Sequence, residues 1–269
     1  MAVALEQLAP AEELRLVPAV TPRFALTTSV PTLDRLLGPF ESGRITLIDS
    51  GSDYVFHLTS LLCVRAIMED SDVVFVDGGN SIDPYGIAAI AKRVGLARLE
   101  VLPRISVARA FTCYQMATLL NEMLAARVAE TEARLVVLSC LPTMFLDEDV
   151  PALEAHQLFL RSMRAVRDVT RSRGTITVAT NAGLAKLHRR KGIRRVLYES
   201  VDRWARFQHH RGGLRISVPE LDVEELYRPV PANQATLDDY AYALPRIMDL
   251  QEGIEPREVR SSGYLRFGW

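Results

Sequence analysis

The chain has 269 residues and a formal net charge of −1, from 32 Lys and Arg against 33 Asp and Glu. A chain of this length buries enough surface to fold without disulfides or metal ions, and its near neutrality means that any nucleic-acid contact must come from a local basic patch. No apolar run approaches the roughly 20 residues of a membrane span, and the acidic N-terminus is not a signal peptide. The sequence therefore predicts a cytoplasmic protein with access to the nucleoid and no membrane contact. The three cysteines have no metal-ligand spacing and are expected to be reduced core residues: Cys63, Cys113 and Cys140.

Residues 1–23 are expected to form an N-terminal arm, after which short apolar runs alternate with segments of helical periodicity. Runs rich in Val, Ile and Leu are typical of strands that are buried on both faces. The predicted strands are 44–49, 72–77, part of 99–110, 134–140 and 175–180. The predicted helices are roughly 53–69, 83–95, 114–131 and 153–173. This alternation predicts an α/β fold with a mainly parallel sheet flanked by helices on both faces.

The pattern changes after residue 200. Residues 203–218 predict two short strands about a Gly212-Gly213 turn, which would add an antiparallel hairpin at one edge of the sheet. Residues 219–269 are richer in proline and acids and are expected to form a C-terminal tail with little regular structure. The predicted organisation is a single core domain, 24–218, with an arm and a tail.

One stretch has the outline of a nucleotide-binding turn: "ITLIDSGSDYVFHLTSLL" (45–62) runs from an apolar strand through small residues into an apolar helix. A phosphate-binding loop places its backbone amides around the phosphates, and adds a lysine and a hydroxyl that serve the outer phosphates and magnesium. No lysine is present in this stretch. The sequence therefore has the position of such a loop without its cationic part.

Five segments, in order, resemble the RecA/RadA recombinase family, closest to its archaeal-eukaryotic branch. They are "LTTSVPTLDRLLGPFESGRITLI" (26–48), "VVFVDGGNSIDPYGIAAIAKRVGL" (73–96), "ISVARAFTCYQMATLL" (105–120), "RLVVLSCLPTMF" (134–145) and "TVATNAG" (177–183). The resemblance covers roughly 26–218 and implies a RecA-like fold. The alternative is an unrelated sheet protein with a chance loop.

The resemblance also assigns roles to single positions. Val55 falls where the family has its phosphate-binding lysine and Phe56 where it has the hydroxyl, while Asp53 adds a negative charge and Gly51 and Ser52 keep the turn small.

The resemblance assigns three further positions. Gly79 falls where the family has the acidic residue that orients water, Ser139 where it has the aspartate that supports magnesium, and Ala182 where it has a glutamine. Thr180 and Asn181 remain, and Asp77 survives without a clear partner. Since phosphoryl transfer depends on positioning and charge, the resemblance implies a pseudo-ATPase without catalytic residues, metal or cofactor.

The strongest charged feature is "AKLHRRKGIRR" (185–195), which the resemblance places in the family's second DNA-binding loop. A flexible basic segment can follow a phosphate backbone. The candidate DNA-binding residues are Lys186, Arg189, Arg190, Lys191, Arg194 and Arg195. A nearby aromatic ring could stack on a base of single-stranded DNA, the favoured form, and the candidates are Tyr198, Trp204 and Phe207. The alternative is a solvated basic loop with Trp204 and Phe207 in the core.

Two further segments bear on a nucleic-acid contact. Four arginines share one face of a predicted helix and either extend the basic surface, meet an acidic partner or are merely solvated: Arg161, Arg164, Arg167 and Arg171. The family's first DNA-binding loop would fall near 145–157, which here is acidic, with Asp147, Glu148 and Asp149. Neighbouring carboxylates repel phosphate, and they lack the spacing of a calcium loop.

The family's filament motif pairs Phe with Ala three residues on, but here Phe24 is followed by Thr27. Association with another RecA-like protein or a repair mediator subunit, through the arm, the sheet edge or the aromatic end "GYLRFGW" (263–269), is therefore expected rather than self-polymerisation. The resulting hypothesis is a non-hydrolysing accessory protein of DNA recombination and repair. The alternatives are a pseudo-ATPase scaffold that binds only protein, and an enzyme that hydrolyses nucleotide with a partner's residues.

Overall fold

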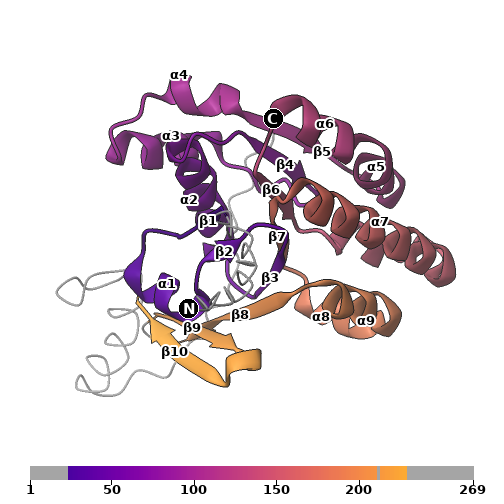
Figure 1. The fold of residues 1–269 in the computed structure, drawn as a ribbon. Helices are drawn as coiled ribbons and strands as arrows, with labels where there is room; N and C mark the ends of the chain where they lie inside the picture. Colours follow the sequence, from indigo (N-terminus) through magenta and orange to yellow (C-terminus); the bar gives the residue numbers. More distant parts are fainter. Residues whose placement is uncertain (1–23, 211–212, 229–269) are drawn as a thin grey trace, which may run out of the picture.

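A computed structural model describes residues 24–210 and 213–228. Eight strands form one sheet in the order β10-β9-β8-β3-β7-β6-β4-β5 (Figure 1). The sheet strands are β3 (Ile45–Ser50), β4 (Val73–Asp77), β5 (Ile105–Arg109), β6 (Leu135–Ser139), β7 (Ile176–Asn181), β8 (Arg203–His210), β9 (Gly213–Val218) and β10 (Val223–Tyr227). A separate two-stranded pair consists of β1 (Ala25–Leu26) and β2 (Phe40–Glu41). The expected arm, the Gly212 turn position and residues 229–269 lie outside the described residues.

Helices cover both faces of the sheet and give three layers (Figure 1). One apolar core lies under α1 (Pro31–Leu37), α2 (Tyr54–Met68), α3 (Pro84–Arg93) and α4 (Arg98–Val101). The other lies under α5 (Cys113–Thr118), α6 (Leu124–Thr131), α7 (Ala152–Arg173), α8 (Leu184–Arg189) and α9 (Lys191–Ser200). A π-helical turn, Leu119–Met123, joins α5 to α6. Three short 3-10 turns complete the described elements: Leu102–Arg104, Thr143–Leu146 and Pro219–Leu221.

Alternation along each strand explains how one sheet serves two cores. In β4, Val73 and Phe75 face the first core, whereas Val74 and Val76 face the second. Successive side chains of a strand point to opposite faces, so a continuous run of Val and Phe is buried on both sides. This confirms the α/β fold with a mainly parallel sheet and an antiparallel extension at one edge.

The antiparallel edge is longer than expected. β8 runs parallel to β3, and β9 returns antiparallel to β8. β10 then pairs with β9 from Val223 to Tyr227, so the expectation of little regular structure after residue 218 is wrong for this segment. β10 is an edge strand whose side chains are mostly exposed, and this explains why its apolar content is too low to predict a strand.

Strand register brings the candidate site residues together. Asp77 of β4 lies beside Ser139 of β6, and Asp49 of β3 lies beside Asn181 of β7. These positions are at the carboxyl ends of parallel strands, where open α/β sheets bind their ligands. In the part of the chain that the structure describes, no helix combines the length and hydropathy needed to cross a bilayer.

Candidate nucleotide loop and nucleic-acid interface

The loop after β3 uses its backbone amides within the chain. The Gly51 amide donates to the carbonyl oxygen of Phe207 at 2.9 Å, and the Ser52 amide donates to Ser50 Oγ at 3.0 Å. The amides of the first helical turn donate to Ser52 and Asp53: Tyr54 N to Ser52 Oγ (3.3 Å), Val55 N to the Ser52 carbonyl (3.4 Å) and Phe56 N to the Asp53 carbonyl (3.0 Å). A phosphate cradle consists of unoccupied amides that converge on the ligand. In this loop the same donors are directed at protein oxygens.

The side chains of the loop carry no cation. Val55, matched to the family's lysine, is fully buried among the apolar residues under α2. Phe56, matched to the hydroxyl, is half-buried and packs against the same core. Asp53 is exposed at the start of α2 and makes no side-chain capping hydrogen bond. The only formal charge among residues 50–56 is therefore that of Asp53.

Asp77 at the end of β4 is buried and fully engaged. Its carboxylate accepts hydrogen bonds from the amides of Gly79 (3.1 Å), Ser81 (3.0 Å) and Ile82 (3.2 Å) and from Ser81 Oγ (2.9 Å), and Arg109 Nη2 lies 3.4 Å away. Burial alone would raise the pKa of Asp77, but these hydrogen bonds together lower it below its ordinary value. The expectation that Asp77 has no partner is wrong: the ionised carboxylate organises residues 78–82.

Gly79, matched to the water-orienting acid, is packed against Cys140. A Cβ atom at Gly79 would lie 2.4 Å from Cys140 Sγ and 2.7 Å from its Cβ. Cys140 itself has a left-handed backbone, with φ of 52°. Any side chain at residue 79 therefore requires Cys140 to move.

Hydroxyl groups connect the neighbouring strand ends. Ser81 Oγ, which donates to Asp77, lies 2.6 Å from Ser139 Oγ, and Ser139 Oγ lies 3.3 Å from Thr180 Oγ1. Thr180 Oγ1 also accepts from the Cys140 amide at 2.8 Å. Ser139, matched to the family's magnesium-supporting aspartate, is thus part of a chain of hydroxyl groups that reaches the Asp77 carboxylate through Ser81.

A second buried carboxylate, Asp49, was not singled out by the sequence. Asn181 Nδ2 donates to Asp49 Oδ1 at 3.0 Å, the Tyr198 hydroxyl donates to Asp49 Oδ2, and Arg206 Nη2 lies 3.5 Å from the same oxygen. Burial and the contact with Asp49 raise the pKa of Tyr198 to about 12. The polar end of "RITLID", in an otherwise apolar strand, is the signal that marks Asp49. The side chain of Asn181, the amide that remains from the family pattern, is therefore occupied by hydrogen bonds within the protein.

The basic segment 185–195 is helical, not the flexible loop that its composition predicts. It forms most of α8 and the first half of α9, with Leu187, Ile193, Val196 and Leu197 buried along these helices. Gly192 is not a hinge: a Cβ there would lie 2.9 Å from His156 Nδ1 of α7. The glycine lets two helices approach closely.

The six candidate DNA-binding cations differ in their interactions within the protein. Arg189 lies 3.6 Å from Glu148, Arg190 Nη2 donates to the Asp147 carbonyl at 2.8 Å, and Arg195 pairs with Glu199 at 2.8 Å. Arg194 lies over the ring of Tyr198, 6.0 Å from its centroid. Within the described residues, Lys186 and Lys191 are exposed and take part in no hydrogen bond or ion pair. The structure thus brings the acidic loop 147–149 against α8.

The three aromatic candidates for base stacking belong to the fold. Phe207 is fully buried, so the expectation that it could stack on a base is wrong. Tyr198 and Trp204 are half-buried and meet edge to face, with ring centroids 5.0 Å apart. Arg206 covers the indole of Trp204 at 5.1 Å. Each of these three rings therefore makes contacts within the fold.

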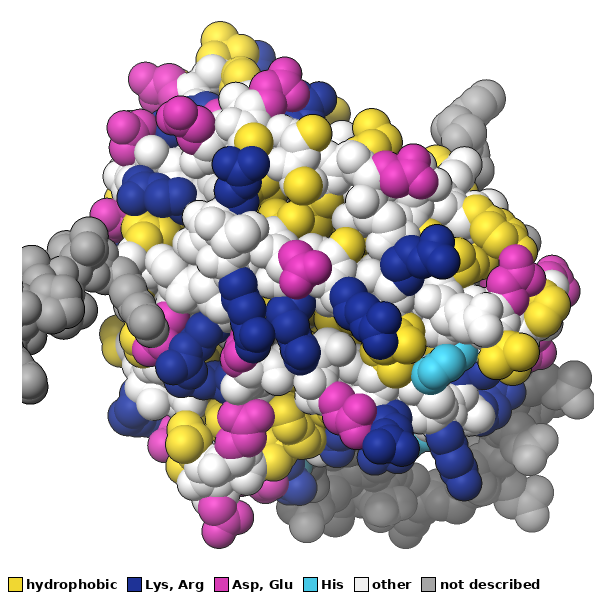
Figure 2. All heavy atoms as spheres, turned by 45° about the vertical axis from the view of Figure 1, so that its right-hand side comes forward, with side chains coloured by type: hydrophobic (Ala, Val, Ile, Leu, Met, Phe, Trp, Pro, Cys, Tyr) yellow, Lys and Arg dark blue, Asp and Glu magenta, His cyan; other side chains and the backbone are white. Residues whose placement is uncertain are grey.

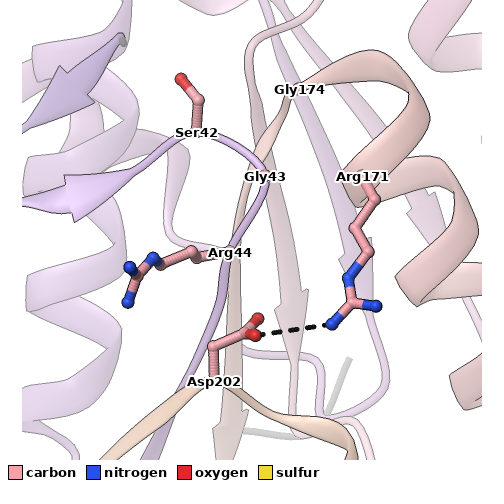
Figure 3. A pocket seen from close by; sticks show the side chains of 6 residues that line it. All are labelled: Ser42, Gly43, Arg44, Arg171, Gly174 and Asp202. Atoms are coloured by element: carbon pink, nitrogen blue, oxygen red, sulfur yellow. Dashed lines mark ion pairs between the residues drawn. The ribbon is translucent and has the colours of Figure 1, made fainter.

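A surface depression of about 620 Å³ lies at the opposite, amino end of the strands (Figure 3). Its side chains include Arg171 of α7 and Asp202, 3.8 Å apart. Asp202 also accepts from the Ile45 amide at 2.8 Å, so it fixes the start of β8 beside β3. Over the described residues, no group of three or more His, Cys, Asp or Glu side chains could hold a metal ion.

Phe24 packs against its own domain. The guanidinium of Arg134 lies 4.0 Å from the centroid of its ring, and the ring borders the first apolar core. In this structure Phe24 is therefore held by an intramolecular contact.

Comparisons with known proteins agree with this architecture. Residues 23–190 match the Rad51 family model. The chain is 28% identical over 182 residues to a DNA repair protein Rad51 homolog of Drosophila melanogaster, covering 62% of this chain and 53% of the relative. It is 25% identical over 177 residues to DNA repair protein RAD51 of Mycosarcoma maydis (61% and 51% covered) and 27% over 176 residues to DNA repair protein RAD51 homolog A of Zea mays (60% and 51%).

The chain spans about half the length of the curated relatives that it matches. The match to the family model covers more than half of the chain, from the strand pair β1–β2 through α8. It includes the loop after β3 and the ends of β4, β6 and β7, where the candidate site residues lie. Together with the sheet order, it shows that the chain belongs to the Rad51 family of the RecA/RadA recombinase superfamily.

Proposed function

We propose that this chain is a non-hydrolysing accessory protein of DNA recombination and repair. It binds DNA through the basic segment 186–195 and associates with another RecA-like protein or a repair mediator subunit. The printed descriptions of its relatives as DNA repair proteins support the process. The basic segment supports the DNA contact.

The hydrogen bonding of the loop after β3 carries the proposal that ATP is not hydrolysed. Amides that a phosphate would need are bonded to protein oxygens, and Val55 supplies no cation. Gly79 and Ser139 supply neither of the two carboxylates of the family pattern. Phosphoryl transfer draws its rate from positioning and from charge stabilisation around the transferred group, and each of those groups is replaced here.

The competing candidate is a pseudo-ATPase scaffold that binds only protein. The observation in its favour is the contact between the basic segment and the acidic loop. Arg189 already forms an ion pair with Glu148, and Arg190 already donates a hydrogen bond to the Asp147 carbonyl. The scaffold predicts no salt-dependent affinity for DNA.

Fluorescence anisotropy with a labelled oligonucleotide separates the two candidates. The test variant replaces Lys186, Lys191 and Arg194 by Gln, and the matched control replaces Lys92, Arg93 and Arg98, three exposed cations of the α3–α4 region, on the other face of the sheet. The proposal expects salt-dependent binding that weakens in the test variant and persists in the control. Absence of binding by the wild type at low salt, or equal loss in both variants, would contradict it.

A further inference from the structure

Two arginines on the outer face of α7 have no protein partner among the described residues. Arg161 and Arg164 are exposed, and neither takes part in a hydrogen bond or ion pair with any residue that the structure describes. Their neighbours on the same helix differ: Arg167 donates to the Glu199 carbonyl at 2.8 Å, and Arg171 lies 3.8 Å from Asp202. A surface guanidinium without a protein acceptor keeps all its donors for an external anion.

α7 and α9 lie side by side, so their outer faces form one surface. Gly192, near the start of α9, packs on His156 of α7, and the carbonyl of Glu199, next to the last residue of α9, accepts a hydrogen bond from Arg167. α9 adds the exposed cations Lys191, Arg194 and Arg195. Figure 2 views the side of the molecule on which these helices lie and shows a band of Lys and Arg side chains, with fewer Asp and Glu among them. We name this the α7–α9 surface.

The charge on α7 itself is strongly one-sided. Its sequence holds five arginines and two carboxylates, Glu154 and Asp168, and Glu154 accepts the hydroxyl of Tyr114. With 1.5 Å of rise per residue, Arg161 and Arg164 are spaced about 4–5 Å along the helix axis. This spacing suits contact with neighbouring phosphates of a nucleic-acid backbone.

We propose that the α7–α9 surface, with Arg161 and Arg164 as its new members, binds the sugar–phosphate backbone of double-stranded DNA. The inference rests on the proposed DNA-binding function and extends it from 186–195 to α7. Duplex DNA offers about one charge per 1.7 Å of axis. No Phe, Tyr or Trp between residues 152 and 200 is exposed, so the surface lacks the stacking platforms that favour single strands. The proposal therefore differs from the single-strand preference that the sequence analysis expects.

The test compares Arg161→Gln/Arg164→Gln with the charge-matched control Lys92→Gln/Arg98→Gln. Anisotropy with labelled duplex and single-stranded oligonucleotides is measured across a salt series, and urea unfolding verifies that both variants are folded. Loss of two phosphate contacts lowers the slope of log affinity against log salt by about 2 for duplex. The control retains the wild-type slope.

An unchanged duplex slope in Arg161→Gln/Arg164→Gln would overturn the inference. If Lys191→Gln/Arg194→Gln still weakens binding in that case, the proposed DNA-binding function stands without the extension to α7. If the wild type binds no DNA at all, the proposed function and the α7–α9 inference are both wrong. Tighter binding of single strands, lost in the same variant, would overturn the duplex assignment. Binding of a labelled poly-glutamate peptide as tightly as duplex DNA, with the same loss in Arg161→Gln/Arg164→Gln, would also overturn it, because that would indicate an acidic protein partner.

Discussion

Arg190 Nη2 donates to the carbonyl oxygen of Asp147 at 2.8 Å, and this contact joins α8 to the loop that carries three consecutive carboxylates. In the same contact Arg189 lies 3.6 Å from the exposed carboxylate of Glu148. A basic segment and an acidic loop that are distant in the sequence (43 residues from Asp147 to Arg190) therefore neutralise one another in part. DNA that approaches α8 competes with Glu148 for Arg189.

Replacing Glu148 by Gln should tighten DNA binding. The variant removes an exposed ion pair, which contributes about 0–1 kcal/mol, together with a charge that repels phosphate. The expected gain in affinity is about 2- to 5-fold, measured by anisotropy at low salt, and it should shrink as salt screens the pair. Glu69→Gln, which breaks the ion pair with Arg65 on α2 at 2.7 Å, is the control and should leave affinity unchanged. Weaker binding by Glu148→Gln would refute the competition.

Asp77→Asn should destabilise the fold by about 2–4 kcal/mol, because a buried, charge-assisted set of hydrogen bonds is lost. The pKa of Asp77 is lowered in the folded state, so its contribution is present above the unfolded pKa, about 3.9, and is lost as pH falls through the folded value. The free energy of unfolding in urea should therefore differ between wild type and variant at neutral pH, and the difference should shrink below about pH 4. A difference that stays constant with pH would contradict this role.

Gly79→Ala should destabilise the protein by about 1–3 kcal/mol, the range of an overpacked site. Its new Cβ would meet only Cys140 Sγ and Cβ. In a Cys140→Gly background both atoms are absent, and glycine also suits the positive φ at residue 140. A double-mutant cycle in urea should hence give a coupling of about 1 kcal/mol or more. Additive effects of the two substitutions would show that Cys140 does not exclude a side chain at position 79.

Val55→Lys would return a lysine to the position at which the family has one. Val55 is fully buried in the apolar core, so the expected result is destabilisation by about 4 kcal/mol or more from an unpaired buried charge, without any gain in ATP affinity. Met68→Lys, at an exposed position near the end of the same helix, is the control and should change stability by about 0.5 kcal/mol or less. Nucleotide-dependent stabilisation of Val55→Lys in a thermal melt would contradict the claim that the loop geometry, beyond the missing lysine, prevents binding.

The parallel core could be predicted from sequence because its signal is local. "DVVFVD" and "RLVVLSC" are apolar runs of the length that a strand buried on both faces requires, and both are strands in the structure. All four predicted helices occur within a few residues of their expected ends, although the one predicted over 114–131 contains a π-helical turn. Long periodic segments and buried strands carry their burial pattern in their own composition.

What could not be predicted depends on partners far away in the chain. The partners of Asp77 are mostly backbone amides, which no side-chain pattern reveals. The helicity of α9 is supported by packing of Gly192 on His156, whereas glycine within a basic run predicts flexibility. Asp49 became significant only when register placed it beside Asn181 and under Tyr198. Tertiary contact outweighed local composition at each of these positions.

The most direct test of the central claim measures the affinity of the purified chain for labelled DNA with and without ATP and magnesium, alongside ATP turnover in the same samples. A nucleotide-independent accessory protein should bind with the same dissociation constant and salt slope in both conditions, with no turnover above the protein-free blank. A protein that ATP switches between states should change its DNA affinity by about 5-fold or more. Such a change, or turnover stimulated by DNA, would contradict the proposal.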